Sequence, residues 1–272
     1  MVGAVTRPSW VTDGIDLERP SASRVYDFYL GGFHNFSSDR EMAERAIKDW
    51  PDLPLIMRSN RAFLRRAVSY LVDQGVRQFL DIGSGIPTVG NVHEIAQDLA
   101  PDSRIVYVDI DPVAVAHSEA ILADNPNATV IAGDFRRPAE ILADPSVTAQ
   151  IDFDQPVALL LLALLHFVSD EDKPAEAIAT FREALVPGSY LAMSHATHEL
   201  HPPELTGFHR SLYRNTATPM TMRSRAQVDG FFDGFTLVDP GIVLADHWHP
   251  DSPELAEHAE RHPNWAGIGR RP

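Results

Sequence analysis

Residues 79–85 form an apolar run that ends in a glycine turn, Phe-Leu-Asp-Ile-Gly-Ser-Gly. A strand that enters such a turn and continues into a helix brings backbone N–H groups close to a ligand, because glycine has no Cβ and a helix starts with unpaired donors. A second apolar run, 104–108, ends at Asp109, 24 residues after Gly85. An acid at the end of the next strand accepts hydrogen bonds from ribose hydroxyls in dinucleotide-type sites. The two runs together predict a nucleoside-containing ligand at the carboxyl edge of a parallel sheet.

From residue 78 onward, short apolar runs alternate with amphipathic segments. Continuous apolar strands between amphipathic helices indicate a parallel sheet covered on both faces. The patterns predict strands near 78–82, 104–109, 128–132, 156–162 and 189–194, and helices near 88–99, 112–123, 138–143 and 174–185. Two final strands, 235–238 and 265–269, are expected on either side of a polar loop rich in Asp, His and Pro.

The first 75 residues have a different, helical pattern. Ser21 or Ser23 can cap a short helix that stops at Gly31 and Gly32, and further helices are expected over 38–48 and 55–73. We therefore expect an N-terminal helical extension or lid, 1–75, packed on a ligand-binding domain, 76–272, as one compact unit. Glycines after the first helix would let this lid hinge.

Composition excludes several classes of protein. The chain has no cysteine, so disulfides, thiol catalysis and zinc–thiolate sites are excluded. The formal charge of −15 disfavours a protein that grips nucleic acid. The strongest apolar run, 157–165, is too short to cross a bilayer, and the first residues lack a secretory pattern. We expect a cytoplasmic protein with no membrane contact, and its oligomeric state stays open.

The glycine turn belongs to neither of two common phosphate-binding patterns. No Gly-Lys-Ser/Thr follows it, as a P-loop requires, and the segment that contains Pro87 lacks the third glycine of the dinucleotide fingerprint. The pattern favours a ligand with one nucleoside and no phosphates. The alternative is that Gly83 and Gly85 only permit a tight turn.

Four segments in order resemble the motifs of class I S-adenosylmethionine-dependent methyltransferases. They are Asp81-Ile82-Gly83-Ser84-Gly85, Val108-Asp109-Ile110-Asp111, Ala132-Gly133-Asp134-Phe135 and the segment 185–194. The whole chain is also similar to an actinobacterial family of largely uncharacterised methyltransferases, with its Tyr-Asp-Phe-Tyr-Leu-Gly-Gly segment at 26–32. The resemblance implies a Rossmann-like α/β fold with a seven-stranded, mostly parallel sheet, its last strand antiparallel and helices on both faces. It also implies S-adenosylmethionine as cofactor and S-adenosylhomocysteine as product.

The resemblance assigns roles to individual positions. Gly83, Ser84 and Gly85 would face the methionine part of the cofactor, Asp81 its amino group, Asp109 the ribose hydroxyls and Ile110 the adenine. The adenine amino group would bind Asp134, with the backbone N–H or the ring of Phe135 beside it, and the far side would be lined by Leu164, Leu165 and His166. Asp111 before Pro112 is expected to cap the next helix rather than to bind ribose. Asp134 and Phe135 could instead serve only as a turn cap and a core residue.

The N-terminal segment and a later insert supply further candidates. Tyr29, Asn35 and Arg58 are candidates for cofactor binding, because an arginine at a helix start can meet a carboxylate; Asn60 and Arg61 lie beside it. The substrate-pocket candidates come from the lid and from the insert 195–222, and they are Phe36, Phe208, Tyr213 and Met220. Ordinary packing and a solvated basic helix face are the alternatives for these positions.

Two histidines are candidates for a general base. His166 and His195 follow the fourth and fifth expected strands, where open α/β sheets place their ligands. A satisfied, noncatalytic histidine is the favoured reading of each. No metal site is expected, because no His-Glu-x-x-His occurs and Pro202 and Pro203 interrupt any helix after His201.

These patterns converge on one function and leave two alternatives. The expected activity is methyl transfer to an O, N or C atom of an unidentified small molecule, with nucleic acid disfavoured as partner. One alternative is an NAD(P)-dependent oxidoreductase on a similar sheet. The other is a noncatalytic protein that binds S-adenosylmethionine or S-adenosylhomocysteine.

Overall fold

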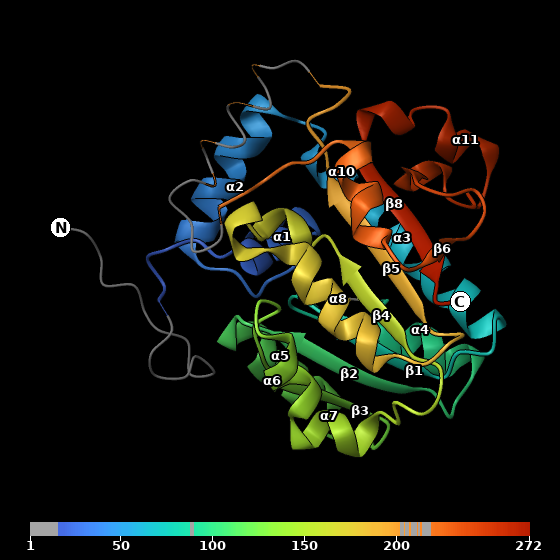
Figure 1. Ribbon diagram of the computed structural model, residues 1–272. Coiled ribbons are helices and arrows are strands. Elements are labelled where there is room, and N and C mark those ends of the chain that lie inside the picture. Colours follow the sequence, from blue (N-terminus) through green and yellow to red (C-terminus); the bar gives the residue numbers. More distant parts are fainter. Residues whose placement is uncertain are drawn as a thin grey trace.

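A single mixed sheet crosses the computed structural model, with helices on both of its faces (Figure 1). The structure describes residues 16–87, 90–201, 204, 207, 211, 213 and 219–272, and in these residues the sheet has eight strands. The strand order is β3-β2-β1-β4-β5-β8-β6, and β7 also pairs with β8. The predicted Rossmann-like α/β fold is therefore confirmed.

The first five strands are parallel. They are β1 (Gln78–Ile82), β2 (Arg104–Asp109), β3 (Ala128–Ala132), β4 (Ala158–Leu162) and β5 (Tyr190–Ala196). The chain runs from β1 outward through β2 to β3, then returns to the other side of β1 for β4 and β5. This reversal opens a crevice at the carboxyl ends of β1 and β4, the place where open α/β sheets bind ligands.

The far edge of the sheet differs from the seven strands expected. Strand β8 (Asn264–Arg270) is antiparallel to β5, as predicted, but its other edge pairs with two short strands. These are β6 (Thr236–Leu237) and β7 (Val243–Leu244). The chain turns between them, where Pro240 has no N–H to donate and Gly241 has a φ of 82°. The count is therefore eight strands rather than seven.

Helices fill the connections close to the predicted ranges. They are α1 (Ala22–Tyr29), α2 (Ser37–Asp49), α3 (Leu53–Asp73), α4 (Val92–Leu99), α5 (Pro112–Leu122), α6 (Pro138–Ala143), α7 (Pro145–Gln150), α8 (Pro174–Ala184), α10 (Arg225–Asp229) and α11 (Pro253–Ala256). Helices α10 and α11 were not predicted, and neither was α7. It forms because the Asp144 side chain accepts from the Ser146 N–H and Pro145 occupies the first helical position. None of the described helices is both long and apolar enough to span a membrane.

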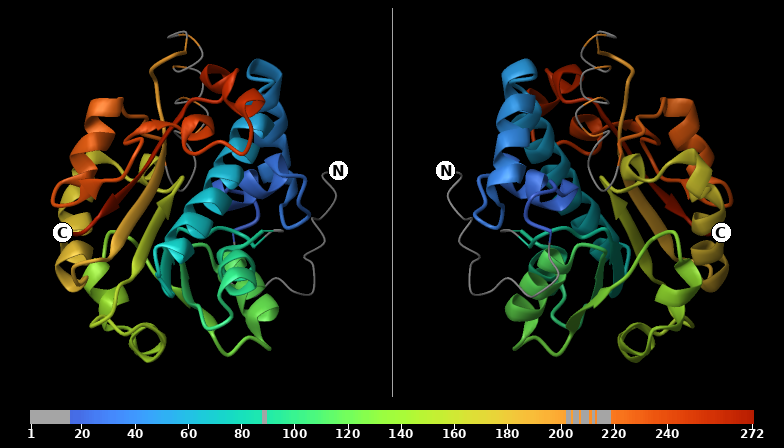
Figure 2. Two further views of the ribbon diagram at one scale, coloured as in Figure 1. Left: turned by 90° about the vertical axis from the view of Figure 1, so that its right-hand side faces the viewer. Right: turned by 90° about the vertical axis from the view of Figure 1, so that its left-hand side faces the viewer.

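Two apolar layers enclose the sheet. On one face, α3 and α4 pack against alternate residues of the strands, such as Phe79 and Leu160. On the other face, α6, α7 and α8 cover the intervening residues, such as Leu80 and Leu159. Figure 2 shows the N-terminal helices, in blue and cyan, and α8 and α10, in gold and orange, on opposite sides of the sheet. The proposed boundary at residues 75 and 76 falls in the turn between α3 and β1, and it stays a prediction.

The segment between β7 and β8 is polar and mostly exposed, as predicted, but one part of it packs against α3. Trp248 is fully buried, and its ring meets Phe63 of α3 edge to face with centroids 5.4 Å apart. The Arg66 guanidinium donates to the Trp248 carbonyl over 2.9 Å and to the Ala245 carbonyl over 2.7 Å. Helix α3 therefore holds this segment against the sheet, through contacts between residues far apart in sequence.

Candidate active site

A cavity of about 740 Å³ opens at the carboxyl ends of β1, β2 and β4. Its floor is the glycine turn after β1 and the end of β2. Its walls are the loops after β3 and β4, and its roof is residues 16–24 with parts of α1 and α3. The cavity therefore occupies the crevice created by the reversal of strand order.

The glycine turn is shaped by two left-handed residues. Gly83 has a φ of 72° and Gly85 a φ of 69°, a region that side chains disfavour. A Cβ on Gly83 would lie 2.5 Å from Cδ1 of Leu164, so only glycine fits there. A Cβ on Gly85 would meet nothing within 4 Å, because Gly85 borders open space beside the cavity. Between them, the Ser84 hydroxyl is buried and has no hydrogen-bond partner.

Two buried carboxylates lie at the ends of neighbouring strands. Asp109 accepts the Gly85 N–H over 2.7 Å and the Asp111 N–H over 2.8 Å, yet burial outweighs these bonds and raises the pKa of Asp109 to about 6. Burial also raises the pKa of Asp81 to about 7, with Asp109 adding to the rise and Arg61 opposing it. Both residues line the cavity.

Arg61 is the arginine of α3 that reaches the cavity. Its Nη2 atom donates to the Gly90 carbonyl over 2.9 Å, and its charge acts on the pKa of Asp81. Arg58 lies on the exposed side of the same helix and does not line the cavity. The candidates Tyr29 and Asn35 are buried outside the cavity lining.

The loop after β3 brings Asp134 to the cavity rim with Arg136. The Arg136 guanidinium donates to both carboxylate oxygens, with Nη2–Oδ2 at 2.6 Å. Burial alone would raise the pKa of Asp134, but the hydrogen bonds and charge of Arg136 lower it below its usual value. The Phe135 ring stacks on Phe181 with centroids 6.0 Å apart, while Ile110 opposite this loop is 56% exposed. All but Phe181 line the cavity.

The loop after β4 contributes an apolar wall. Leu164, Phe167 and Val168 line the cavity, whereas Leu165 is fully buried in the core beneath it. His166 also lies outside the lining. Its Nδ1 atom accepts from the Ala196 N–H over 3.3 Å.

His195 is part of a buried junction behind this wall. It is fully buried, its Nδ1 bonds the Ala196 carbonyl over 2.7 Å, and its Nε2 lies 3.0 Å from Nη1 of Arg223. An arginine can only donate, so Nε2 accepts and the ring is neutral. Burial, with the positive charge of Arg223, lowers the pKa of His195 to about 3. Neither His166 nor His195 lines the cavity.

Arg223 was not a sequence candidate, and it organises the loop after β4. Its guanidinium donates to the carbonyls of Leu165 and Val168 and to Oδ1 of Asp170, at 2.7 to 3.0 Å. No local pattern marks this role, because the partners are more than 50 residues away in sequence. Arg223 thereby fixes the loop that carries Phe167.

The substrate-pocket candidates lie mainly in packed clusters. Phe36 packs with Ile86 and Val113, and Tyr213 and Met220 pack with α1 and α2. Phe208 lies outside the described residues. Among the described residues, no group of three or more His, Asp or Glu is placed to hold a metal ion.

A polar chain crosses the cavity wall between α1, α3 and β5. Ser194 on β5 donates its hydroxyl to the Asn60 side-chain oxygen over 2.5 Å, and the Asn60 amide donates to the Tyr26 hydroxyl over 2.9 Å. Tyr26 donates in turn to the Met57 carbonyl over 3.2 Å, and burial raises its pKa. Tyr26 and Asn60 line the cavity and place neutral polar groups in it.

Comparison with known proteins places nearly the whole chain in one family. Residues 8–272 match the family model described as S-adenosyl methyltransferase. A crystal structure of a DUF574 family protein from Streptomyces avermitilis is 40% identical, with a TM-score of 0.90, over 94% of this chain and 99% of that one. A putative methyltransferase from Thermobifida fusca is 39% identical, also with a TM-score of 0.90, over 97% of this chain and 99% of that one.

A curated relative matches only a short part of the chain. The ribosomal RNA small subunit methyltransferase H of Halorhodospira halophila is 33% identical over 63 residues. These residues are 23% of this chain and 19% of that protein.

Proposed function

The chain belongs to the S-adenosyl methyltransferase family, and on that basis we propose that it methylates a small molecule held in the cavity beside the cofactor. It is a class I S-adenosylmethionine-dependent methyltransferase, with S-adenosylmethionine as cofactor. The acceptor and the acceptor atom are the parts that the proposal adds. A formal charge of −15 favours a small molecule over a nucleic acid as acceptor, and the lack of cysteine suits a cytoplasmic enzyme.

The residues around the cavity fit this cofactor. Asp109 offers carboxylate oxygens to the ribose hydroxyls at the end of β2. Asp81 offers a carboxylate to the cofactor's ammonium group, and the unpartnered Ser84 hydroxyl lies between the two glycines. The space beside Gly85, which a Cβ would partly fill, admits ligand atoms close to the backbone. The two carboxylates therefore match the hydrogen-bond donors of the cofactor, and the space beside Gly85 leaves room for its atoms.

Arg61 is our proposed partner for the cofactor's carboxylate. It lies beside Asp81 at the cavity and carries the positive charge that a carboxylate requires. Asp81 and Arg61 would then hold the two charged ends of an amino acid. This pairing replaces Arg58 as the candidate on α3.

The chemistry depends on alignment more than on proton transfer. The cofactor supplies a methyl group on a positively charged sulfur, already activated for attack. Leu164, Phe167 and Val168 exclude water from the side where the methyl acceptor binds. An acceptor that is held in line with the methyl group, away from water, accounts for much of the rate of such a transfer. Tyr26 and Asn60 present neutral polar groups that orient an acceptor. We assign no proton transfer to His166 or His195, since neither lines the cavity.

One observation carries the proposal: Asp81 and Asp109 lie near the carboxyl ends of adjacent strands and line the same cavity, beside the glycine turn. Calorimetry should show binding of S-adenosylmethionine and S-adenosylhomocysteine. Methyl-labelled cofactor should then transfer label to a component of a small-molecule extract, with an RNA fraction as the parallel sample. Label in RNA alone would contradict the small-molecule acceptor, and absence of S-adenosylhomocysteine binding would contradict the whole assignment.

A further inference from the structure

A short segment that leads into the first turn of α1 covers one side of the cavity. We call residues 16–24 the strap. Its cavity-lining residues are Asp16, Arg19, Pro20, Ser21, Ala22, Ser23 and Arg24. Ser21 and Ser23 contact Asp111, which lies between the cavity-lining Ile110 and Pro112 and two residues after Asp109. The strap therefore borders the part of the cavity proposed for the nucleoside.

Asp111 ties the strap to the floor of the cavity. Both Ser21 and Ser23 donate their hydroxyls to Oδ2 of Asp111, the second over 2.9 Å. The other oxygen, Oδ1, caps α5 by accepting the Val113 N–H over 2.9 Å, as predicted for this residue. The Asp111 backbone N–H donates to Asp109 over 2.8 Å. Two hydrogen bonds thus connect the strap hydroxyls with the proposed ribose-binding carboxylate.

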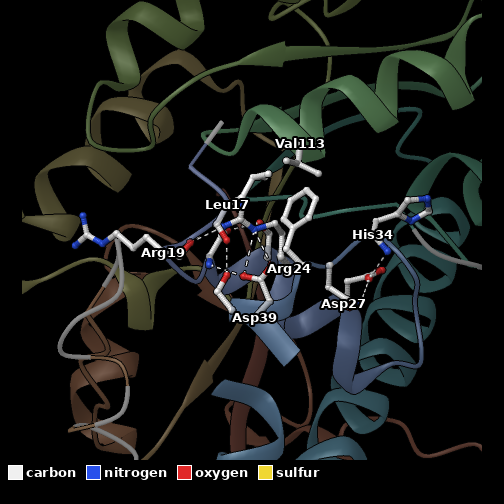
Figure 3. Close-up of polar contacts among 12 residues, drawn as sticks. Leu17, Arg19, Arg24, Asp27, His34, Asp39 and Val113 are labelled. Carbon is white, nitrogen blue, oxygen red and sulfur yellow. Dashed lines mark hydrogen bonds and ion pairs between the residues drawn. The ribbon is translucent and has the colours of Figure 1, made fainter. Parts of the chain in front are cut away.

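Arg24 holds the strap in its curved path. It is buried, as is Asp39, and its Nε atom lies 3.2 Å from the Asp39 carboxylate. Its remaining nitrogens donate to the carbonyls of Asp16, over 3.1 Å, and Arg19, over 2.6 Å. Figure 3 shows Arg24 between Asp39 and the strap backbone. The buried Arg24 side chain therefore holds the backbone of the strap in its bend.

Leu17 joins the strap to two cofactor-binding elements. Its side chain packs in an apolar notch made by Phe36, Ile86, Val113 and Ala114. Ile86 follows the glycine turn, and Val113 begins the helix after Asp111. The close-up view places Leu17 toward Val113 (Figure 3). A movement of the glycine turn or of the start of α5 would therefore also move the strap.

We propose that the strap completes the nucleoside end of the cofactor site, and that Asp111 is the positioning residue that keeps it closed through Ser21 and Ser23. Cofactor and product then leave from this end only after both hydroxyl bonds open. The bonds hold the strap in the position in which it lines the cavity, so their loss should weaken binding, mainly through a faster dissociation rate.

The test uses the double variant S21A/S23A of the full chain. Arg24 and Leu17 still hold the strap in this variant, so it should fold. We expect its dissociation rate for S-adenosylhomocysteine, measured by stopped-flow fluorescence, to rise about three- to tenfold. The matched variant S21T/S23T keeps both hydroxyls and should restore a rate near that of the unchanged protein.

A second ligand locates the effect. 5′-Methylthioadenosine has the nucleoside but no amino acid, so S21A/S23A should weaken its binding by the same factor, whereas R61A should weaken only S-adenosylhomocysteine. Unchanged dissociation of both ligands in S21A/S23A, or a loss limited to S-adenosylhomocysteine, would overturn the proposed strap. Because this inference rests on the proposed function, the unchanged protein is measured first. If it binds neither ligand, the proposed function itself fails.

Discussion

The backbone N–H of Gly85 donates to Oδ2 of Asp109 over 2.7 Å, and this bond joins the turn after β1 to the last residue of β2. The glycine turn and the acid are thus held at a fixed separation by the protein alone. A preorganised site loses little free energy in ordering itself around a ligand. The same bond occupies one lone pair of the carboxylate and leaves others for the ribose contact that we propose.

Replacement of Asp109 by alanine should weaken cofactor binding at least about tenfold, roughly 1.4 kcal/mol, because the ribose hydroxyls lose their acceptors. Titration calorimetry with S-adenosylmethionine measures this directly. The control is D102A, which removes an exposed carboxylate just before the same strand. A folded D109A variant with unchanged affinity would contradict the ribose assignment.

Cofactor affinity should fall as pH falls from about 8 to about 5. The pKa of Asp81 is raised to about 7 and that of Asp109 to about 6, so both carboxyls gain protons in this window. A protonated carboxyl attracts an ammonium group less and has one acceptor fewer for hydroxyls. Measurement of Kd for S-adenosylhomocysteine across this pH range tests whether the affinity falls as the pH falls. In D81N the change of Kd near pH 7 should disappear. If it persists, another group is responsible for it.

The same burial predicts an effect of Asp81 on stability. Its folded pKa of about 7 lies above the ordinary value of 3.8, so its favourable contribution is present below about pH 4 and is lost as pH rises through 7. D81N should therefore raise the unfolding temperature of the cofactor-free protein at about pH 8 and leave it nearly unchanged at about pH 4. Calorimetric melts at both pH values test this. An equal shift at both would point to packing instead of charge.

Two arginines three residues apart on α3 form a matched pair. R61A should weaken S-adenosylhomocysteine binding about tenfold, because a charged hydrogen-bond donor to the ligand carboxylate is lost. R58A removes the same charge from the exposed face and should leave the affinity unchanged. Equal losses in both variants would indicate a general effect of charge and would contradict a direct contact.

R223M should destabilise the fold by about 3–5 kcal/mol, since the variant leaves the buried carbonyls of Leu165 and Val168 without their donor. Urea unfolding measures the change. The control R137M alters an arginine whose side chain is 66% exposed, and it should shift stability by less than about 0.5 kcal/mol. A loss below 1 kcal/mol in R223M would mean that the loop after β4 is held by other contacts.

The central sheet could be predicted because its signals are local. Each of β1 to β5 has five to seven residues, most of them apolar, and the prolines at the starts of α5, α6 and α8 mark helix beginnings. At the far edge, β6 and β8 were predicted from short apolar runs, but β7 and the packing of the segment before β8 were not. The burial of Trp248 depends on Phe63 and Arg66, and no pattern within the segment itself records those partners.

Some residues of the candidate site could likewise be predicted from local patterns, and others could not. Asp81, Gly85 and Asp109 follow strands in the sequence, so their position at the cavity follows from the parallel sheet. Arg61 was considered beside Arg58, but the choice depends on which side of α3 faces β1. The strap contacts join Ser21 to Asp111 across 90 residues, which only the assembled fold reveals.

The sheet edge formed by the short strands β6 and β7 beside β8 also affects whether another copy of the protein can extend the sheet. An uninterrupted outer strand would offer a long row of free N–H and carbonyl groups to a strand of another molecule. Here β6 and β7 are two residues each, with a turn between them, so an incoming strand finds no extended ladder to continue. This border of the molecule is thereby protected against aggregation through sheet extension.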